Sequence, residues 1–182
     1  MRRVDLRSGA LIAGLALGVV IATRGRKATA SWLAGLKRNA AIYQDEESVV
    51  AAVNRGDEAV GVVDQYYWYR LRREIGARAI HCALYYFPNG VPGSVVNVSG
   101  AAVLASSRHR RDAERFVAFV VSRASQRLIS QGDDYEYPVR PGVAPNPQLR
   151  AFASISHASI AATALGTDLP ARELIIQAGF GS

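Results

Sequence analysis

The chain has 182 residues, of which 49% are hydrophobic and 20% are charged, so it is long enough for one ordinary domain with a sizeable apolar core. Its formal net charge of +7 lies entirely within residues 1–38, where eight Lys or Arg face a single Asp, whereas the remaining residues hold fourteen charges of each sign. The body of the protein is therefore neutral, and a nucleic-acid partner that binds a basic patch is not supported.

Residues 1–27 form an atypical basic and apolar segment, in which an almost uninterrupted apolar run over 9–22 follows a basic start. The pattern mimics a secretory signal peptide, with a small-residue cleavage pattern at 28–30. Three positive charges within 24–27 are unusual directly after an export signal. We therefore favour the other interpretation, an altered internal helix over 11–20. The apolar run is also shorter than the roughly twenty residues that a membrane span needs.

Two helices are predicted next, over residues 28–38 and 46–55. In the first, one face carries apolar side chains at three- and four-residue spacing: Trp32, Leu33 and Leu36. The second begins with two acidic residues, which suit the positive end of a helix, and stops at Gly56. Three of its valines are expected to face inward: Val49, Val50 and Val53.

A short β-branched run over residues 59–63 follows a turn and is typical of a buried strand in an α/β sheet. Directly behind it, residues 64–70 hold three tyrosines, a tryptophan and an arginine. We predict a helix over 66–75 that ends at Gly76, with its positive end where the strand stops. Open α/β sheets bind their ligands at that place.

Tyr66 and Tyr67 are the candidate ligands at this junction. A phenol has an ordinary pKa of about 10 and is neutral, but a bound trivalent cation favours the phenolate. Hard, highly charged ions prefer such hard oxygen donors. Adjacent side chains in a strand point to opposite faces, so both phenols can reach one ion only where the chain bends. On spacing alone, two rim aromatics with satisfied hydroxyl groups are the better interpretation.

The later elements carry less chemistry. Residues 79–87 predict another strand, inside which Tyr85 and Tyr86 diverge and are expected to be structural. A long helix is predicted over 111–130, with an apolar stripe of four side chains: Phe116, Phe119, Val120 and Leu128. Short helices are predicted over 148–153, 157–165 and 169–178, with His157 as a spare histidine on a surface helix.

Four ordered segments resemble the carboxyl-terminal half of the bacterial ferric-iron-binding periplasmic proteins that serve ABC importers: DEESVVAAVNRG (45–56), GVVDQYYWYR (61–70), VNVSGAAVL (96–104) and YEYPV (135–139). The resemblance runs from about residue 28 to 180. It implies an α/β fold, namely a periplasmic-binding-protein-like (type II) lobe with a mixed sheet flanked by helices, incomplete relative to the two-lobed family. It assigns 28–93 to the second lobe with the tyrosine pair, 94–132 to the crossover and a first-lobe portion, and 133–182 to the return to the second lobe.

The resemblance also implies a function, which is the solute-binding component of an ABC-type iron(III) importer, in truncated form. Tyr66 and Tyr67 would give phenolate oxygens to Fe(III), beside a synergistic anion such as carbonate or phosphate. The expected partner is an ABC permease in the inner membrane, and the expected location is the periplasm. The family's other iron ligands precede residue 28 and have no counterpart here. Where many members carry asparagines at the anion, this chain has Glu46 and Asp64, which would repel it unless Arg70 or the helix end compensates.

No catalytic motif is found, because the sequence lacks a Gly-rich phosphate loop, a nucleophile elbow and a Cys-x-x-Cys pair. We therefore expect no enzyme. The single cysteine, Cys82, cannot form an internal disulfide and has no second metal cluster to join. An alternative function is a secreted or anchored α/β module that kept the fold and lost metal binding. A third function, a regulator with a solute-binding-like effector domain, is disfavoured because the first sixty residues contain no helix-turn-helix pattern.

Overall fold

The structure is a computed structural model of the chain, and it describes residues 18–88, 91, 94–96, 98–156, 166–167 and 169–180. These residues fall into two compact units. The first takes its described residues from Met1–Val63, Leu84–Asn97 and Ser156–Ser182, and the second consists of Asp64–Ala83 and Val98–Ile155. The units group residues by contact within this chain, whereas the predicted boundaries at 28, 94 and 133 follow the lobes of a larger protein. The lobe boundaries therefore stay a prediction.

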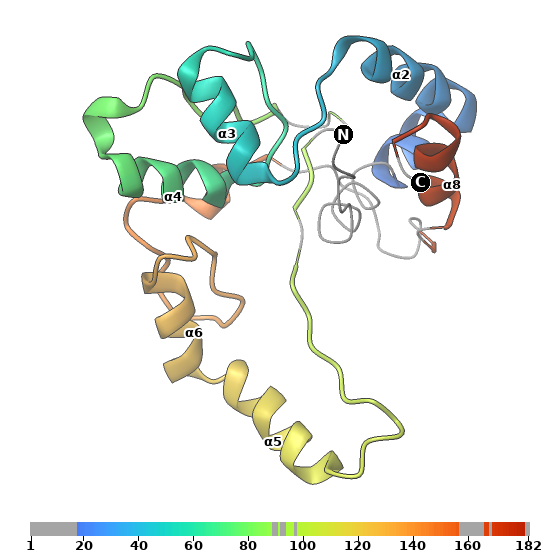
Figure 1. Cartoon of the computed structure of the whole chain (residues 1–182). Coiled ribbons are helices and arrows are strands. Elements are labelled where there is room, and N and C mark those ends of the chain that lie inside the picture. Colours follow the sequence, from blue (N-terminus) through green and yellow to red (C-terminus); the bar gives the residue numbers. More distant parts are fainter. Residues whose placement is uncertain are drawn as a thin grey trace. The chain divides into compact units, whose positions relative to one another are not determined.

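The core of the first unit lies between α2 (Arg26–Asn39) and α8 (Leu169–Gln177), drawn in blue and red in Figure 1. Its buried members are Leu33, Ala171 and Leu174, each at most 3% exposed. The predicted helix over 28–38 is confirmed, but Trp32 is 52% exposed and Leu33 is 3% exposed, so these two residues do not share one buried face as predicted. The buried line runs through Thr29 and Leu33, and a residue next to Leu33 is rotated about 100° away from it.

Helix α3 (Glu46–Arg55) begins and ends at the predicted residues. The Asp45 carboxylate accepts a hydrogen bond from the Ser48 backbone N–H at 2.8 Å, which caps the start of the helix. Gly56 ends it in the left-handed conformation, with φ of 82°, which costs a glycine little. Val50 is buried as predicted. The chain then passes close to α3, since a Cβ added at Gly61 would lie within 3.1 Å of valine methyl groups.

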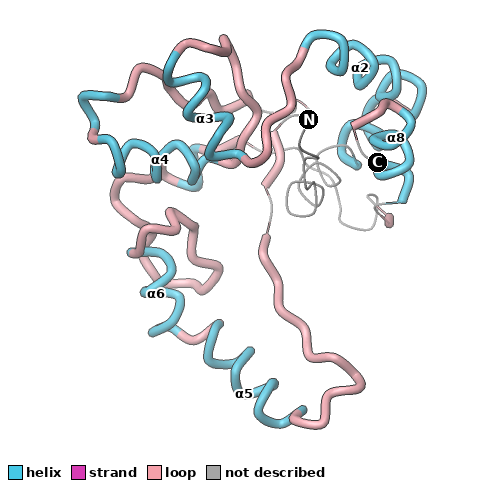
Figure 2. The backbone as a smooth tube through the Cα atoms, viewed as in Figure 1, coloured by secondary structure: helices cyan, strands magenta, loops and turns pink. Residues whose placement is uncertain are grey.

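No strand is found among the described residues, and Figure 2 accordingly draws the predicted strand regions as loops. Residues 59–63 and 80–88 are extended but do not pair with a neighbouring segment in the described part of the chain. The expectation that 59–63 is buried is wrong, because Val60 and Val62 are 81% and 83% exposed. An apolar, β-branched run becomes a buried strand only where other strands bond to its backbone and other elements cover its faces. The predicted mixed sheet is thus not observed in these residues.

The second unit contains α4 (Gln65–Ile75), η1 (Ala77–Ala79), α5 (Arg110–Val120), α6 (Arg123–Gln131) and η2 (Phe152–Ser154). Helix α4 matches the prediction, including its end at Gly76. The predicted helix over 111–130 is instead two helices, because the Ser122 side chain caps α6 by accepting from the Ser125 N–H at 3.2 Å.

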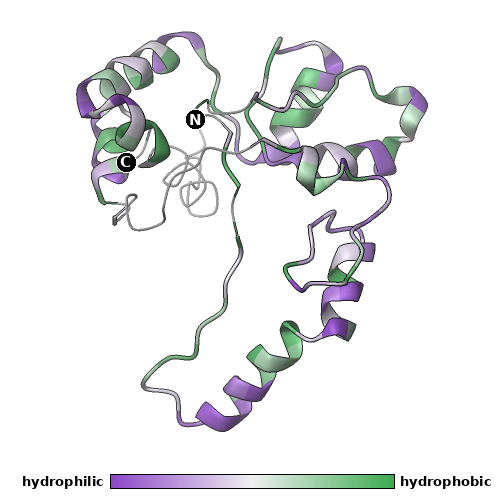
Figure 3. Cartoon of the chain, turned by 180° about the vertical axis from the view of Figure 1, so that it is seen from behind, coloured by the Kyte–Doolittle hydropathy of each residue, from purple (hydrophilic) through white to green (hydrophobic). Residues whose placement is uncertain are grey.

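Helix α5 buries none of its residues. The two phenylalanines of the predicted apolar stripe, Phe116 and Phe119, are 62% and 58% exposed, and the second half of α5 is coloured as hydrophobic in Figure 3. An apolar face of this kind is unusual on the surface of a monomer.

The end of the chain agrees with prediction in part. Helix α8 corresponds to the predicted helix over 169–178, and Gly179 follows it with a positive φ of 77°. The predicted helix over 148–153 is reduced to the short turn η2, and the one over 157–165, with His157, lies outside the described residues. None of the helices that the structure describes is long and apolar enough to cross a bilayer.

Candidate metal site

Tyr66 and Tyr67 lie in the first turn of α4. This helix begins directly after Asp64, whose backbone is extended at the N-cap position. Their ring centroids are 4.3 Å apart with an interplanar angle of 41°, so the structure brings the two rings side by side. Both side chains are half-buried. The chain changes from extended to helical at this point, as the sequence predicted, although the extended part is not a strand.

Arg70 lies one turn further along α4 and reaches back over both rings. Its guanidinium carbon is 4.9 Å from the ring centroid of Tyr66 and 5.6 Å from that of Tyr67. One Nη atom is also 3.5 Å from a carboxylate oxygen of Asp134. Arg70, which the sequence named as a possible compensating charge, therefore does lie at the tyrosine pair. A cation at this place attracts an anion and opposes a metal ion.

Two carboxyl groups lie in the electrostatic range of this cluster. Burial raises the pKa of Asp64, and a hydrogen bond with the Tyr66 hydroxyl partly opposes that rise. Burial also raises the pKa of Glu136, the charges of Asp64 and Asp134 raise it further, and Arg70 lowers it. The sequence predicted Asp64 here but missed Glu136 and Asp134. The one signal in the sequence was their position. Glu136 lies inside the segment YEYPV, which resembles the family, and Asp134 directly precedes it.

Aromatic packing anchors the helix that carries the pair. Tyr69 is 7% exposed, and its ring stacks on that of Tyr135 at 5.2 Å with an interplanar angle of 19°. Trp68 packs edge-on against Tyr69 and donates from its indole nitrogen to the Cys82 carbonyl at 3.1 Å. These contacts fix the rotation of α4 and so hold Tyr66 and Tyr67 on one side of it.

The other candidate ligands include Cys82 and Glu46. Within the described ranges, no three His, Cys, Asp or Glu side chains come together to hold a metal ion. Cys82 is half-buried and forms no disulfide, and its neighbour His81 is exposed. Glu46, the second carboxylate that was expected near an anion, lies on α3 in the first unit. The local donors are thus the oxygens of two phenols and nearby carboxylates.

Comparisons with known proteins extend over most of the chain. Residues 5–155 match the family of bacterial extracellular solute-binding proteins. The Fe(3+)-binding periplasmic protein of Serratia marcescens is 31% identical over 163 residues, which cover 90% of this chain and 48% of that protein. The major ferric iron-binding protein of Neisseria meningitidis is 32% identical over 160 residues, which cover 88% of this chain and 48% of that protein.

A solved structure is similar as well. The crystal structure of iron-bound HitA from Pseudomonas aeruginosa superposes with a TM-score of 0.83 at 37% identity, over 95% of this chain and 55% of that one. The chain therefore spans about half the length of these relatives. The predicted resemblance to ferric-iron-binding proteins is confirmed, and the fold is that of part of a periplasmic-binding-protein-like molecule. Because the match covers residues 5–155, the chain belongs to the family of bacterial extracellular solute-binding proteins.

Proposed function

We propose that this chain is the ferric-iron-binding, carboxyl-terminal half of the solute-binding component of an ABC-type iron(III) importer. The observation that carries the proposal is the pair Tyr66 and Tyr67, placed side by side with centroids 4.3 Å apart at the start of α4. The names of the relatives support iron as the cargo, since they are described as Fe(3+)-binding and ferric iron-binding proteins. Phenolate oxygens are hard donors that suit a hard trivalent cation.

The two phenolates fill only part of a coordination shell of about six donors. Asp64 is the next candidate, because its carboxylate already shares a proton with Tyr66 and would be released for the metal when that phenol ionises. Arg70 has the opposite role. Its positive charge over both rings would hold a synergistic carbonate or phosphate beside the metal and offset the repulsion between that anion and Asp64.

We also infer how this chain fits into a complete, two-lobed binding protein. In the complete binding protein, residues 59–63 and 79–87 would be strands of a mixed sheet in the second lobe, and 94–132 would cross to a first lobe. Closure of two lobes would supply the remaining donors and exclude water. The chain, which spans about half the length of such relatives, would act in the periplasm and deliver iron to a permease in the inner membrane.

A spectroscopic titration tests the tyrosine assignment. Ferric iron, added as its citrate complex to the purified chain, is expected to produce the visible charge-transfer band of an iron–phenolate complex. The double variant Tyr66→Phe with Tyr67→Phe keeps both rings and removes both donors, so the band should vanish while the circular dichroism stays the same. The matched control changes the other adjacent pair, Tyr85→Phe with Tyr86→Phe, and should keep the band. If the Tyr66/Tyr67 variant colours like its parent, the assignment is wrong.

One observation favours the alternative of a module that kept the fold and lost metal binding. The Arg70 guanidinium lies over both phenol rings, where it repels a cation. Under this alternative the parent chain gives no band, whereas Arg70→Gln, which removes the repelling charge, gains one. Under the iron-binding proposal both give it, so the two functions are distinguished by the same titration.

A further inference from the structure

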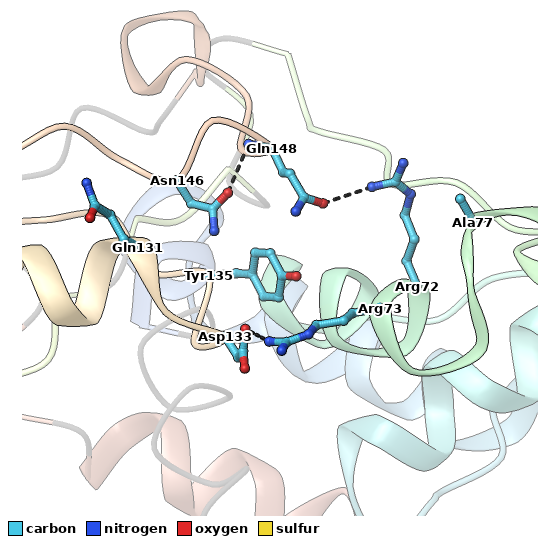
Figure 4. Close-up of a pocket in the computed structure, with 8 residues that line it drawn as sticks. All are labelled: Arg72, Arg73, Ala77, Gln131, Asp133, Tyr135, Asn146 and Gln148. Carbon is cyan, nitrogen blue, oxygen red and sulfur yellow. Dashed lines mark hydrogen bonds and ion pairs between the residues drawn. The ribbon is translucent and has the colours of Figure 1, made fainter.

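The second unit contains a pocket of about 340 Å³ that Arg72 and Arg73, in the C-terminal half of α4, help to line (Figure 4). Its volume lies in the range of ligand-binding pockets. Apart from one alanine, its lining consists of polar groups, namely two guanidinium groups, three amides, a carboxylate and a phenol. Such a lining disfavours an apolar ligand and offers many hydrogen-bond donors.

The two arginines of the pocket differ in their partners. Arg73 forms an ion pair with Asp133, so that pair is neutral overall. Arg72 donates from Nη1 to the uncharged side-chain oxygen of Gln148 at 3.0 Å, and its guanidinium lies 5.7 Å from the Trp68 ring centroid. No carboxylate partner of Arg72 occurs in the described part of the chain. The pocket therefore has a net charge of one positive unit, centred on Arg72.

Two residues of the pocket lining, Tyr135 and Asn146, are buried. Tyr135 is 3% exposed and stacks on Tyr69, and Figure 4 shows its hydroxyl on the side where Arg72 and Arg73 approach. Its φ of 52° is the only positive value of a non-glycine residue in the described ranges. Asn146 is 8% exposed, and its side-chain oxygen accepts from the Gln148 N–H at 3.0 Å.

We propose that this pocket binds a small anion with several acceptor oxygens, of the class of inorganic phosphate, with Arg72 as its principal donor. A guanidinium group presents two parallel N–H groups to such an anion, and the amides of Gln148 and Asn146 can add neutral donors. The C-terminal end of α4 carries a partial negative charge, which makes the uncompensated guanidinium essential for an anion to bind here. The site is separate from any anion held with iron at Arg70, because Arg70 lies over the Tyr66 and Tyr67 rings and does not line this pocket.

Isothermal titration calorimetry of the iron-free chain tests this proposal, with inorganic phosphate as the probe and sodium chloride holding the ionic strength constant. Saturable binding at one site is expected. Arg72→Gln should weaken it about tenfold or more, the usual cost of losing a hydrogen bond to a charged group. Asp133→Asn should strengthen binding, because it leaves the charge of Arg73 uncompensated. Arg111→Gln, which removes the same charge from exposed α5, should change the affinity by less than about twofold.

A second variant keeps the test decisive if Arg72→Gln does not fold. Gln148→Glu places a carboxylate against Arg72, which keeps the contact and neutralises the pocket, so phosphate binding should be lost while the fold remains. Citrate, titrated in parallel, distinguishes a carboxylate ligand from a phosphoryl one by its relative affinity. The proposal is overturned if the parent shows no saturable phosphate binding, if Arg72→Gln and Gln148→Glu both bind like the parent, or if Arg70→Gln abolishes binding instead.

Discussion

Truncation of Leu33 to alanine measures how much the small core of the first unit contributes to stability. Leu33 is 3% exposed and packs against Ala171 and Leu174 of α8, which are 1% and 2% exposed. The change removes three buried carbon atoms and leaves a cavity, which costs about 2–5 kcal/mol in well-packed cores. Most neighbours of this core are only partly buried, so the site can collapse around the cavity. We therefore expect the lower part of that range, about 2–3 kcal/mol.

Urea unfolding followed by far-ultraviolet circular dichroism checks this value, and thermal unfolding should show a midpoint lowered by about 5–10 °C. The matched control is Trp32→Ala, which removes a larger side chain from the adjacent position of α2, where it is 52% exposed. That variant should lose less than about 1 kcal/mol. Equal losses at the two positions, or a larger loss for Trp32, would show that α2 packs with a different face and would refute the reasoning.

Two further predictions concern the approach to α4. Gly61→Ala should destabilise the chain by about 1–3 kcal/mol in urea unfolding, because the new Cβ would lie 2.5 Å from Val49 Cγ1 and 3.1 Å from Val53 Cγ2. The control Gly100→Ala should not destabilise it, because nothing lies within 4 Å of a Cβ at that position. Equal effects of the two variants would contradict the close approach of Gly61 to α3. Asp64→Asn should make the iron-free chain more stable than its parent at neutral pH, with the difference disappearing below the ordinary aspartate pKa of 3.8. The sign follows from the raised pKa of Asp64, since the folded chain then holds the proton more tightly and loses stability as the pH rises through that pKa. Urea unfolding of both chains at neutral pH and below the ordinary aspartate pKa measures the difference. If Asp64→Asn is more stable than its parent by the same free energy at both pH values, the prediction is wrong.

Local rules were sufficient wherever a helix is specified by its own residues. Helix α3 has an aspartate that caps its start, acidic residues in its first turn and a glycine that ends it, and it occupies the predicted residues. Helix α4 ends at Gly76 for the same kind of reason. The prediction failed where a local cap was overlooked, since Ser122 starts a new helix inside the apolar pattern that had been assigned to one helix.

The sheet depends on partners that a local pattern does not contain. The run over 59–63 has the composition of a buried strand, yet Val60 and Val62 are 81% and 83% exposed, and no described segment pairs with its backbone in a sheet. Composition shows that a segment is apolar enough to be buried. Only the tertiary structure decides whether other parts of the chain pack against that segment.

The candidate site divides in the same way. The sequence by itself determined Tyr66, Tyr67, Asp64 and the nearby Arg70, because all four lie within seven residues and helical geometry alone brings them to one end of α4. Glu136 and Asp134 join them from a segment about seventy residues later, and Gln148 reaches Arg72 from still further along the chain. Contacts between residues so distant in sequence depend on how the chain folds back on itself, so only the tertiary structure could decide them.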